Sequence, residues 1–391
     1  MPVVNRFADL HDEITAWRRD IHQNPELLFD VERTAGVVAE KLRAFGCDEV
    51  VEGIGRTGVV GIIKGRETGS GRVVGIRADM DALPMTEITG KPWASRTPGK
   101  MHACGHDGHT AMLLGAARYL AETRNFDGAV AVIFQPAEEG GGGGREMVED
   151  GMMDRFGVQE VYGLHNMPGL PAGQFAIRPG PQMAAADHFS IEIEGLGGHA
   201  AQPHRCVDTT LVAAQVIVAL QSIASRNVDP LESVVVTVAA LHTEGTAFNV
   251  IPQRAEMKGT VRTLSPAAQD LTERRIAEIA DLTARAHGAT ARVDYIRNYP
   301  VTENHPAQAE FAAAIAAEIA GEGMVDRATP PLMGAEDFSF MLNARPGAFI
   351  FLGAGDGADV HNPAYDFNDA IIPAGCSYWA RLIETAMPVR A

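Results

Sequence analysis

The stretch VAVIFQPAEEG, residues 130–140, indicates the fold class of this 391-residue chain. Its first five residues, VAVIF, form an apolar run of the length of a single buried strand. Short runs rich in valine and isoleucine are typical of strands that are buried on both faces of an α/β sheet. Glu138 and Glu139 follow where this strand ends, so the same stretch also carries reactive side chains.

Four further apolar runs have the same character, with glycine or charge at their ends. They occupy residues 58–63, 73–76, 161–164 and 348–352. Helical patterns lie between the runs, because apolar residues recur at three- and four-residue steps. Helices are predicted over 7–21, 32–45 and 109–121. Strands that alternate with helices predict a domain of the α/β class.

The middle of the chain has a different order of elements. Strands are predicted over 189–194, 234–241, 254–263 and 289–297, and helices over 208–224 and 266–286. This βαββαβ order is that of a ferredoxin-like domain. We therefore expect an outer α/β domain, residues 1–186 and 299–391, interrupted by a small inserted domain over 187–298.

Length, charge and cysteine content limit the function classes. A chain of 391 residues is longer than a single hydrophobic core usually supports, which favours two domains. The formal net charge of −17 excludes a basic nucleic-acid surface and gives no attraction to anionic membranes. No stretch is expected to span a bilayer, and the N-terminal segment lacks the apolar core of a signal peptide. Four cysteines form no disulfide framework in a chain this long, so a cytoplasmic location is expected.

Residues 101–109, MHACGHDGH, predict a metal site. They gather three histidines, a cysteine and an aspartate within nine positions. Thiolate, imidazole and carboxylate groups are the ligands of a borderline-soft divalent ion such as zinc. Cys104 and His106 are two residues apart, so a turn can direct both toward one ion. The alternative is a polar loop whose histidines face solvent.

Polar clusters follow three of the predicted strands. Asp79 and Asp81 come after the run at 73–76, Glu138 and Glu139 after the run at 130–134, and His165 directly after the run at 161–164. Ligands of open α/β sheets bind at the carboxyl ends of strands, so these clusters are expected to meet. Adjacent residues of an extended chain point to opposite sides, which allows one glutamate to bind metal and the other to act as a base. A solvated acidic turn is the alternative.

Several isolated residues are weaker candidates for the site, because their positions alone do not require a function. His361 follows the run at 348–352 and is a ligand candidate because the other clusters lack one member. Glu336 and Asp337 resemble acidic residues in the first turn of a helix, where the helix dipole accounts for them. In the inserted domain His199 lies in a glycine-rich turn. Asn249 and Arg262 fit either a turn cap and a surface charge or a carboxylate site.

Together these motifs resemble the metal-dependent amidohydrolase and aminopeptidase superfamily that contains aminoacylases and glutamate-releasing carboxypeptidases. The chain is most similar to the branch of hippurate hydrolases, N-acyl-amino-acid amidohydrolases and plant auxin–amino-acid conjugate hydrolases. The ordered matches cover nearly the whole chain, at residues 19–22, 25–27, 77–85, 102–109, 135–144, 163–168, 197–204, 249–262, 334–338 and 361–368. The resemblance implies a two-metal catalytic α/β domain whose inserted lid pairs with the lid of another subunit.

The resemblance also implies a role for each motif residue. Two divalent ions, zinc or manganese with nickel or cobalt as substitutes, would be bound by Cys104, His106, Glu139, His165 and His361. Glu138 would be the general base, and His199 would reach the partner's active site to stabilise the oxyanion. Asn249 and Arg262 would hold the substrate carboxylate or shape the lid near it. The superfamily usually has a histidine at the position of Asp79, so we expect Asp79 and Asp81 to orient ligands instead. His102, Asp107 and His109 would hold the loop or orient Cys104 and His106.

The implied activity is hydrolysis of the amide bond of N-acyl amino acids such as hippurate, which releases a carboxylic acid and a free amino acid. The implied assembly is a homodimer or a dimer-based oligomer. Alternatives are a dipeptidase or carboxypeptidase, a deacetylase of an N-acetylated diamino acid, and a non-catalytic metal-binding protein of the same fold. The complete ligand set beside Glu138 argues against the last. A mononuclear zinc deaminase would need a second thiolate pair, which Cys47, Cys206 and Cys376 do not supply.

Overall fold

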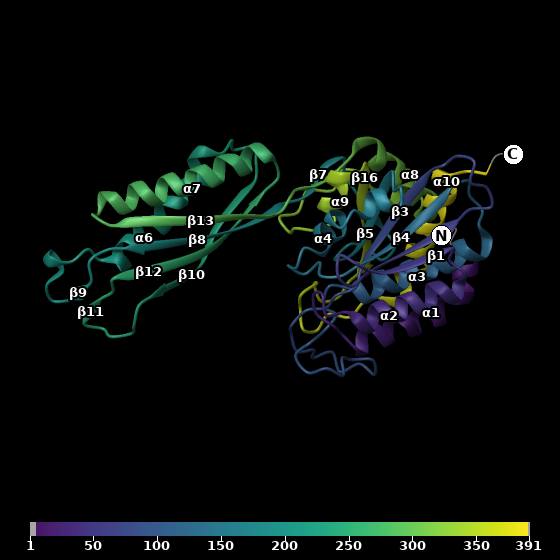
Figure 1. The fold of residues 1–391 in the computed structure, drawn as a ribbon, viewed down its shortest axis with the longest axis horizontal. Coiled ribbons are helices and arrows are strands. Elements are labelled where there is room, and N and C mark those ends of the chain that lie inside the picture. The colour runs from purple at the N-terminus through teal and green to yellow at the C-terminus, as the bar shows by residue number, and fades with distance from the viewer. Residues whose placement is uncertain (1–4, 390–391) are drawn as a thin grey trace. The chain divides into compact units, whose positions relative to one another are not determined.

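A computed structural model describes residues 5–389, which form two compact units. The outer unit comprises the described residues up to 182 together with 303–330 and 337–389. The inserted unit comprises 183–302 and the short segment 331–336 (Figure 1). The sequence predicted an insertion over 187–298, without the contribution of 331–336. Strands β7 (Gly180–Met183) and β14 (Thr302–Asn304) form a two-stranded ribbon where the chain passes between the units.

The outer unit contains an eight-stranded sheet in the order β1-β2-β4-β3-β5-β16-β6-β15. Its central strands β4, β3, β5 and β16 run parallel to one another. The strand bounds are β1 (Glu49–Ile54), β2 (Gly58–Lys64), β3 (Val73–Asp79), β4 (Ala129–Gln135), β5 (Glu160–Pro168), β6 (Phe175–Ala176), β15 (Val325–Asp326) and β16 (Gly347–Gly355). Every residue of β16 from 347 to 354 is buried, so both faces of the sheet are covered there. The predicted α/β class is confirmed.

Helices cover this sheet and complete the core of the outer unit. They are α1 (Asn5–Gln23), α2 (Glu32–Phe45), α3 (His106–Thr123), α4 (Gly143–Glu149), α5 (Met152–Arg155), α8 (Pro306–Ala320), α9 (Ser339–Ala344) and α10 (Ile372–Ala386). Helix α3 is the central one, because α1, α2 and α10 all pack against it. It begins three residues earlier than the predicted helix over 109–121, so His106 is its first residue.

Two strands extend further than their apolar runs. Strand β3 continues to Asp79, whose partner across the sheet is Gln135, and β5 continues past His165, whose partner is Phe351. Backbone pairing with neighbouring strands maintains the extended conformation after the apolar pattern has ended. Asp79 and His165 therefore lie inside the carboxyl ends of strands, where their main chains are held by the sheet.

The inserted unit is a four-stranded antiparallel sheet with two helices on one face (Figure 1). The sheet order is β10-β12-β8-β13, and the elements occur along the chain in the order β8, α6, β10, β12, α7, β13. Their bounds are β8 (Ala185–Glu194), α6 (Thr209–Leu220), β10 (Val234–Thr243), β12 (Arg254–Thr263), α7 (Pro266–Ala286) and β13 (Thr290–Tyr299). Alternate residues such as Ile191 and Met257 face the helices, whereas Glu192 and Glu256 face the opposite side, which no helix covers.

Helix α6 and the short helical segment after it are more apolar than the sequence analysis expected. By length and composition alone, Thr209–Asn227 could cross a membrane. In the inserted unit Val212, Val216 and Leu220 are buried in the core, which accounts for one apolar face of the helix. Leu211 and Val218 lie on another face, with 52% and 68% of their surface exposed. The helix is therefore a core element with a second, uncovered apolar face.

Candidate metal centre

The five predicted metal ligands come from four parts of the outer unit. Cys104 and His106 lie on either side of Gly105, which caps the start of α3. Glu139 follows β4, His165 lies within β5, and His361 belongs to the loop after β16. The carboxyl ends of the parallel strands β4, β5 and β16 point to one edge of the sheet. The topology therefore brings together residues that are up to 257 positions apart in the chain, from Cys104 to His361.

Cys104 lies at the centre of this arrangement. Its sulfur and the ring nitrogens of His106 and His165 all lie within 4.8 Å of one another. The same sulfur forms a second such group with a carboxylate oxygen of Glu139 and a ring nitrogen of His361. Cys104 Sγ is 3.3 Å from His165 Nε2, and Glu139 Oε1 is 3.3 Å from His361 Nε2. The structure thus brings all five predicted ligands together around one thiol.

The donor atoms fit a divalent cation. His106 Nε2 and Glu139 Oε1 are buried and make no hydrogen bond within the part of the chain that the structure describes, although each has an ionic neighbour, Asp79 Oδ2 at 3.6 Å and His361 Nε2 at 3.3 Å. A buried polar atom without a partner costs about 1–3 kcal/mol, so such atoms call for an additional binding partner. Imidazole, carboxylate and thiolate donors at this spacing suit a borderline-soft divalent ion. The cluster therefore has the composition of a metal site.

The protonation of each candidate ligand shows which protons metal binding would displace. Burial lowers the pKa of His165 far below its usual value, which leaves the neutral imidazole that binds metal. Burial raises the pKa of the Cys104 thiol to about 12, so this thiol would release a proton when an ion binds. Burial opposes a charge on His106, but the carboxylates of Asp79 and Asp81 and the Cys104 sulfur together outweigh that effect and raise its pKa well above the usual value. His106 would therefore also release a proton when an ion binds.

Asp81 holds both glutamates and one histidine. Its carboxylate accepts hydrogen bonds from the backbone N–H groups of Glu138 and Glu139, at 3.0 and 3.1 Å. Its main-chain oxygen lies 2.9 Å from His106 Nδ1 and accepts a hydrogen bond when that nitrogen is protonated. His106 Nε2 is then the nitrogen that remains for a metal. Asp81 therefore sets the orientation of the candidate base and of two candidate ligands.

Asp79 lies beside the ligand cluster, with its Oδ2 3.6 Å from His106 Nε2, and two other side chains hold it there. Its Oδ1 lies 2.6 Å from His109 Nδ1, and its Oδ2 accepts a hydrogen bond from Arg77 Nη1 at 2.8 Å. His109 in turn contacts Asn166, with 2.6 Å between Nε2 and Oδ1. These contacts hold the Asp79 carboxylate next to His106, which fits the predicted role of Asp79 in orienting a ligand.

Two residues of the centre have unusual backbone conformations. Ala137, which precedes Glu138, has φ +53°, and His361 has φ +64°. Residues other than glycine rarely adopt the left-handed region, and such strain gathers at functional sites. A hydrogen bond from Ala137 N to Leu28 O, at 3.0 Å, helps to hold the first of these turns. The strain supports the assignment of functional roles to Glu138 and His361.

The sequence analysis missed the role of Arg77 and gave a wrong explanation for Asp337. Helix α9 begins only at Ser339, so Asp337 is not in the first turn of a helix. Its carboxylate instead accepts hydrogen bonds from Arg77 Nη2 at 3.1 Å and from the backbone N–H of Gly144 at 2.8 Å. A buried guanidinium needs carboxylate partners, which decides where Asp337 lies. The sequence signal that could have revealed this role was an arginine directly after an apolar run, at a position that the sheet buries.

The inserted unit contains three predicted site residues, the catalytic candidate His199 and the substrate-binding candidates Asn249 and Arg262, and the structure brings only the first two together. His199 is in β9 (Gly198–His199), which pairs with β11 (Val250–Ile251), and the next residue's N–H donates to Asn249 O at 3.0 Å. Arg262 lies eight residues beyond the start of β12, about 27 Å along the strand at roughly 3.4 Å per residue. One small ligand therefore cannot contact Asn249 and Arg262 of the same chain.

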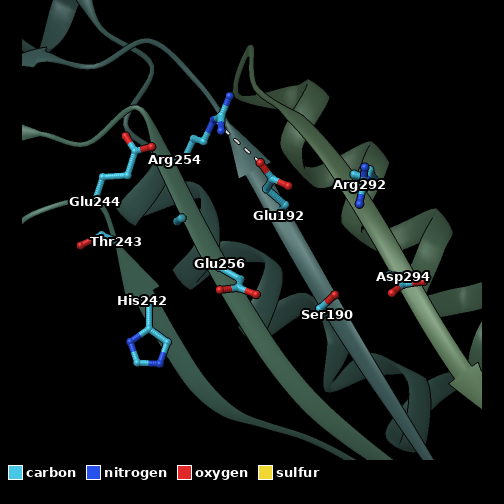
Figure 2. A pocket seen from close by; sticks show the side chains of 10 residues that line it. Ser190, Glu192, His242, Thr243, Glu244, Arg254, Glu256, Arg292 and Asp294 are labelled. Carbon is cyan, nitrogen blue, oxygen red and sulfur yellow. Dashed lines mark ion pairs between the residues drawn. The ribbon is translucent and has the colours of Figure 1, made fainter.

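A separate cavity lies on the uncovered sheet face of the inserted unit (Figure 2). It has a volume of about 400 Å³. Its lining residues are Ser190, Glu192, His242, Thr243, Glu244, Arg254, Ala255, Glu256, Arg292 and Asp294. None of the predicted site residues is among them. Arg254 and Glu192 form an ion pair across neighbouring strands at 3.8 Å, which is typical of a solvated sheet face.

The chain is similar to known proteins over most of its length. Residues 75–385 match the model of peptidase family M20/M25/M40. A hippurate hydrolase of Campylobacter jejuni is 44% identical over 382 residues, which cover 98% of each chain. An N-acetylcysteine deacetylase of Bacillus subtilis is 38% identical over 378 residues, covering 95% of this chain and 96% of the relative. These matches span both units.

A solved structure supports the same grouping. It belongs to a Bacillus subtilis protein described as a dinuclear metal-binding peptidase from the M20 family. The two structures superpose with a TM-score of 0.85 at 34% sequence identity, and the alignment covers 97% of this chain and 99% of the other. The resemblance inferred from the motifs is confirmed by the family match and by these relatives.

Proposed function

Since this chain belongs to peptidase family M20/M25/M40, we propose that it is a metal-dependent amidohydrolase that acts on N-acyl amino acids. The reaction splits the amide bond and releases a carboxylic acid and a free amino acid. The observation that carries this proposal is the placement of Glu138 beside the Cys104-centred ligand cluster, with its backbone held by Asp81. The hippurate hydrolase and deacetylase relatives support the N-acyl amino acid as the substrate class.

The cofactor in this proposal is a pair of divalent ions, zinc or manganese, with nickel or cobalt as substitutes. The five ligands would be Cys104, His106, Glu139, His165 and His361. Bound ions would supply Lewis acidity toward the substrate carbonyl and would lower the pKa of water at the site. The dinuclear relative and the two ligand groups that share Cys104 support the number of ions.

Glu138 acts as the general base. Its carboxylate takes a proton from the attacking water, whose oxygen forms a bond to the carbonyl carbon of the substrate. When the carbon–nitrogen bond breaks, Glu138 returns that proton to the leaving amine, so the protons balance over the cycle. Glu138 is buried, and its backbone N–H bond to Asp81 keeps it at a fixed position during both transfers.

We also propose that the protein is a homodimer or a dimer-based oligomer in which the inserted unit is the dimerisation element. The exposed apolar face of α6, with Leu211 and Val218, supports this assembly, because such a face is unfavourable in water. In a dimer His199 and Asn249 of one subunit would complete the partner's active site. His199 would then stabilise the oxyanion, and Arg262 would hold the substrate carboxylate from its own chain.

A reducing compartment fits this site. All four cysteines are free, and Cys104 must keep its sulfur unoxidised in order to bind metal. We therefore propose that the protein acts in the cytoplasm. Neither a nucleic acid nor a membrane is required by any step of the proposed reaction.

Replacement of Glu138 by glutamine tests the proposed function. We expect Glu138→Gln to keep the metal content and melting temperature of the wild type, while kcat falls by at least about 100-fold, the usual loss when a general base is removed. The exposed Glu149→Gln, on the adjacent helix α4, is the matched control and should keep full activity. Near-normal turnover of Glu138→Gln would contradict its role as the base.

A substrate panel separates the proposed activity from its alternatives. Hippurate, N-acetyl amino acids, an N-acetylated diamino acid and dipeptides are each supplied to the metal-loaded wild type, and kcat/KM is compared. We expect the N-acyl monoamino acids to be the best substrates. A preference for dipeptides would show a peptidase, and a preference for the acetylated diamino acid would show a biosynthetic deacetylase. Failure of the wild type to hydrolyse any of these amides would contradict the proposed function.

A further inference from the structure

A second buried polar cluster lies behind the candidate metal centre and has no role in the mechanism above. It joins Arg18 and His22 of α1 to His102 and Asp107 of the MHACGHDGH segment. All four residues are almost completely inaccessible to solvent, with relative exposures of 0%, 0%, 1% and 0%. Burying charged groups this deeply costs free energy unless they are paired, so the cluster calls for a functional explanation.

Asp107 is the member that both helix residues contact. His22 Nδ1 lies 2.8 Å from Asp107 Oδ2, and Arg18 Nη1 lies 3.6 Å from the same oxygen. Arg18 is itself held from the other side, because its Nε donates to Asp369 Oδ1 at 2.7 Å. His22 Nε2 is 3.4 Å from Glu87 Oε2. Two cationic side chains of α1 thus fix one carboxylate of α3.

The fixed carboxylate is next to a metal ligand. Asp107 is the second residue of α3, and His106 is the first. The imidazole of His106 is held by the main-chain oxygen of Asp81, whereas Asp107 is held by α1. Asp81 and α1 thus restrain two adjacent residues of α3, His106 and Asp107. Together the two restraints set the rotation of the first turn of α3 and the direction of the His106 ring.

The cluster is not arranged for maximal stability. Both ring nitrogens of His102, one oxygen of Asp107 and Arg18 Nη2 make no hydrogen bond among the residues that the structure describes. Each unpaired buried atom is unfavourable, and an apolar cluster of the same volume would avoid that cost. Unpaired buried atoms around the first turn of α3 are more consistent with a functional constraint than with packing alone.

We propose that Arg18 and His22 are positioning residues for metal binding. They hold Asp107 and thereby keep Cys104 and His106, on either side of Gly105, in the geometry that a cation requires. This inference rests on the proposed function for the existence of the metal site, but it concerns residues of α1 that touch no candidate ligand. Partners that orient metal ligands change metal affinity by roughly 10- to 100-fold when they are removed.

The experiment measures zinc affinity of the apoprotein by competition with a chromophoric chelator, and it needs no substrate. His22→Leu and Arg18→Met remove the contacts to Asp107 and should weaken zinc binding by roughly 10- to 100-fold. His22→Asn retains an N–H at the position of Nδ1 and should stay within about threefold of the wild type. This rescue by the conservative variant would not be seen if His22 only filled space.

Ile14→Ala is the matched control. Ile14 is also buried on α1 and packs against α3, because a Cβ added at Gly115 would lie 2.6 Å from its Cδ1. The control should lower the melting temperature and leave zinc affinity unchanged. Equal loss of affinity in Ile14→Ala and His22→Leu, or wild-type affinity in His22→Leu, would overturn this inference alone. A wild type that binds no zinc would contradict both the inference and the proposed metal centre.

Discussion

Single residues decide whether the candidate ligands can be brought together. Gly105 separates two candidate ligands and has φ +98°, in the left-handed region. A Cβ at this position would lie 2.0 Å from Asn166 Oδ1 and 2.6 Å from the Tyr365 hydroxyl. Both neighbours are buried and hydrogen-bonded to each other, so neither can move away freely. The absence of a side chain at Gly105 is therefore as necessary to the centre as the ligands themselves.

Gly105→Ala should damage both stability and metal binding. We expect a loss of about 1–3 kcal/mol in the free energy of unfolding from backbone strain and steric conflict, measured by urea denaturation. Zinc affinity of the apoprotein should fall more than tenfold. Gly36→Ala is the control, because Gly36 lies in α2 with nothing within 4 Å of an added Cβ. That variant should gain roughly 0.5–1 kcal/mol through helix propensity. Wild-type stability and zinc affinity in Gly105→Ala would contradict the requirement for glycine at this position.

At the scale of elements, α1 acts as the support of α3. Its apolar residues at 7, 10 and 14 pack into the core, and Arg18 and His22 continue the same buried face as charges. Burial alone would lower the pKa of His22, but the carboxylates of Asp107 and Glu87 together outweigh burial and raise the pKa to about 9. The contact between the two helices is therefore an ion pair at neutral pH.

The raised pKa of His22 predicts how stability depends on pH. In the unfolded chain the pKa of histidine is about 6.5, so the stability that protonated His22 contributes is complete below about pH 6.5. It is lost as the pH rises through about 9. The full contribution is about 3 kcal/mol, taken from the difference between these two pKa values.

Urea unfolding of the apoprotein checks this sign. The difference in unfolding free energy between the wild type and His22→Asn should be largest near pH 6 and should shrink toward pH 10. Groups common to both proteins cancel in this difference, so the comparison isolates His22. A difference that stays constant over this range, or that grows with pH, would show that His22 is not held as a cation by Asp107.

At the scale of the whole molecule, the chain divides its predicted site residues between two units. The ligands and Glu138 belong to the outer unit, whereas His199, Asn249 and Arg262 belong to the inserted unit. Within the inserted unit His199 and Asn249 lie near one end of β12 and Arg262 near the other. The proposed dimer, in which each inserted unit serves two active sites, would account for this separation.

Hybrid dimers test the exchange of residues between subunits. Glu138→Gln and His199→Ala should each be nearly inactive as homodimers. If His199 acts on the partner's site, a purified hybrid of the two variants contains one intact site and should have about half of the wild-type activity. If His199 acts within its own chain, each site of the hybrid lacks one group and the hybrid stays inactive. Size-exclusion chromatography of the wild type provides the control for dimer formation.

Much of the fold and the identity of the candidate ligands followed from the sequence alone. Short apolar runs predicted the central strands, and the βαββαβ order predicted the elements that the inserted unit contains. The chemistry of Cys104, His106 and the paired glutamates indicated a metal site, because few other functions need those side chains at strand ends. The family is confirmed, whereas the roles assigned to individual site residues stay predictions.

Only the tertiary structure decided which residues hold that site in place. Arg77 pairs with Asp337 across 260 positions, and His22 contacts Asp107 across 85. Asp81 turns out to hold both glutamates by their backbones. Asn249, which precedes β11, and Arg262, near the end of β12, prove to be far apart. A sequence reports local periodicity and the chemistry of each side chain. It does not report which buried charge meets which partner, because that choice depends on how distant segments pack in three dimensions.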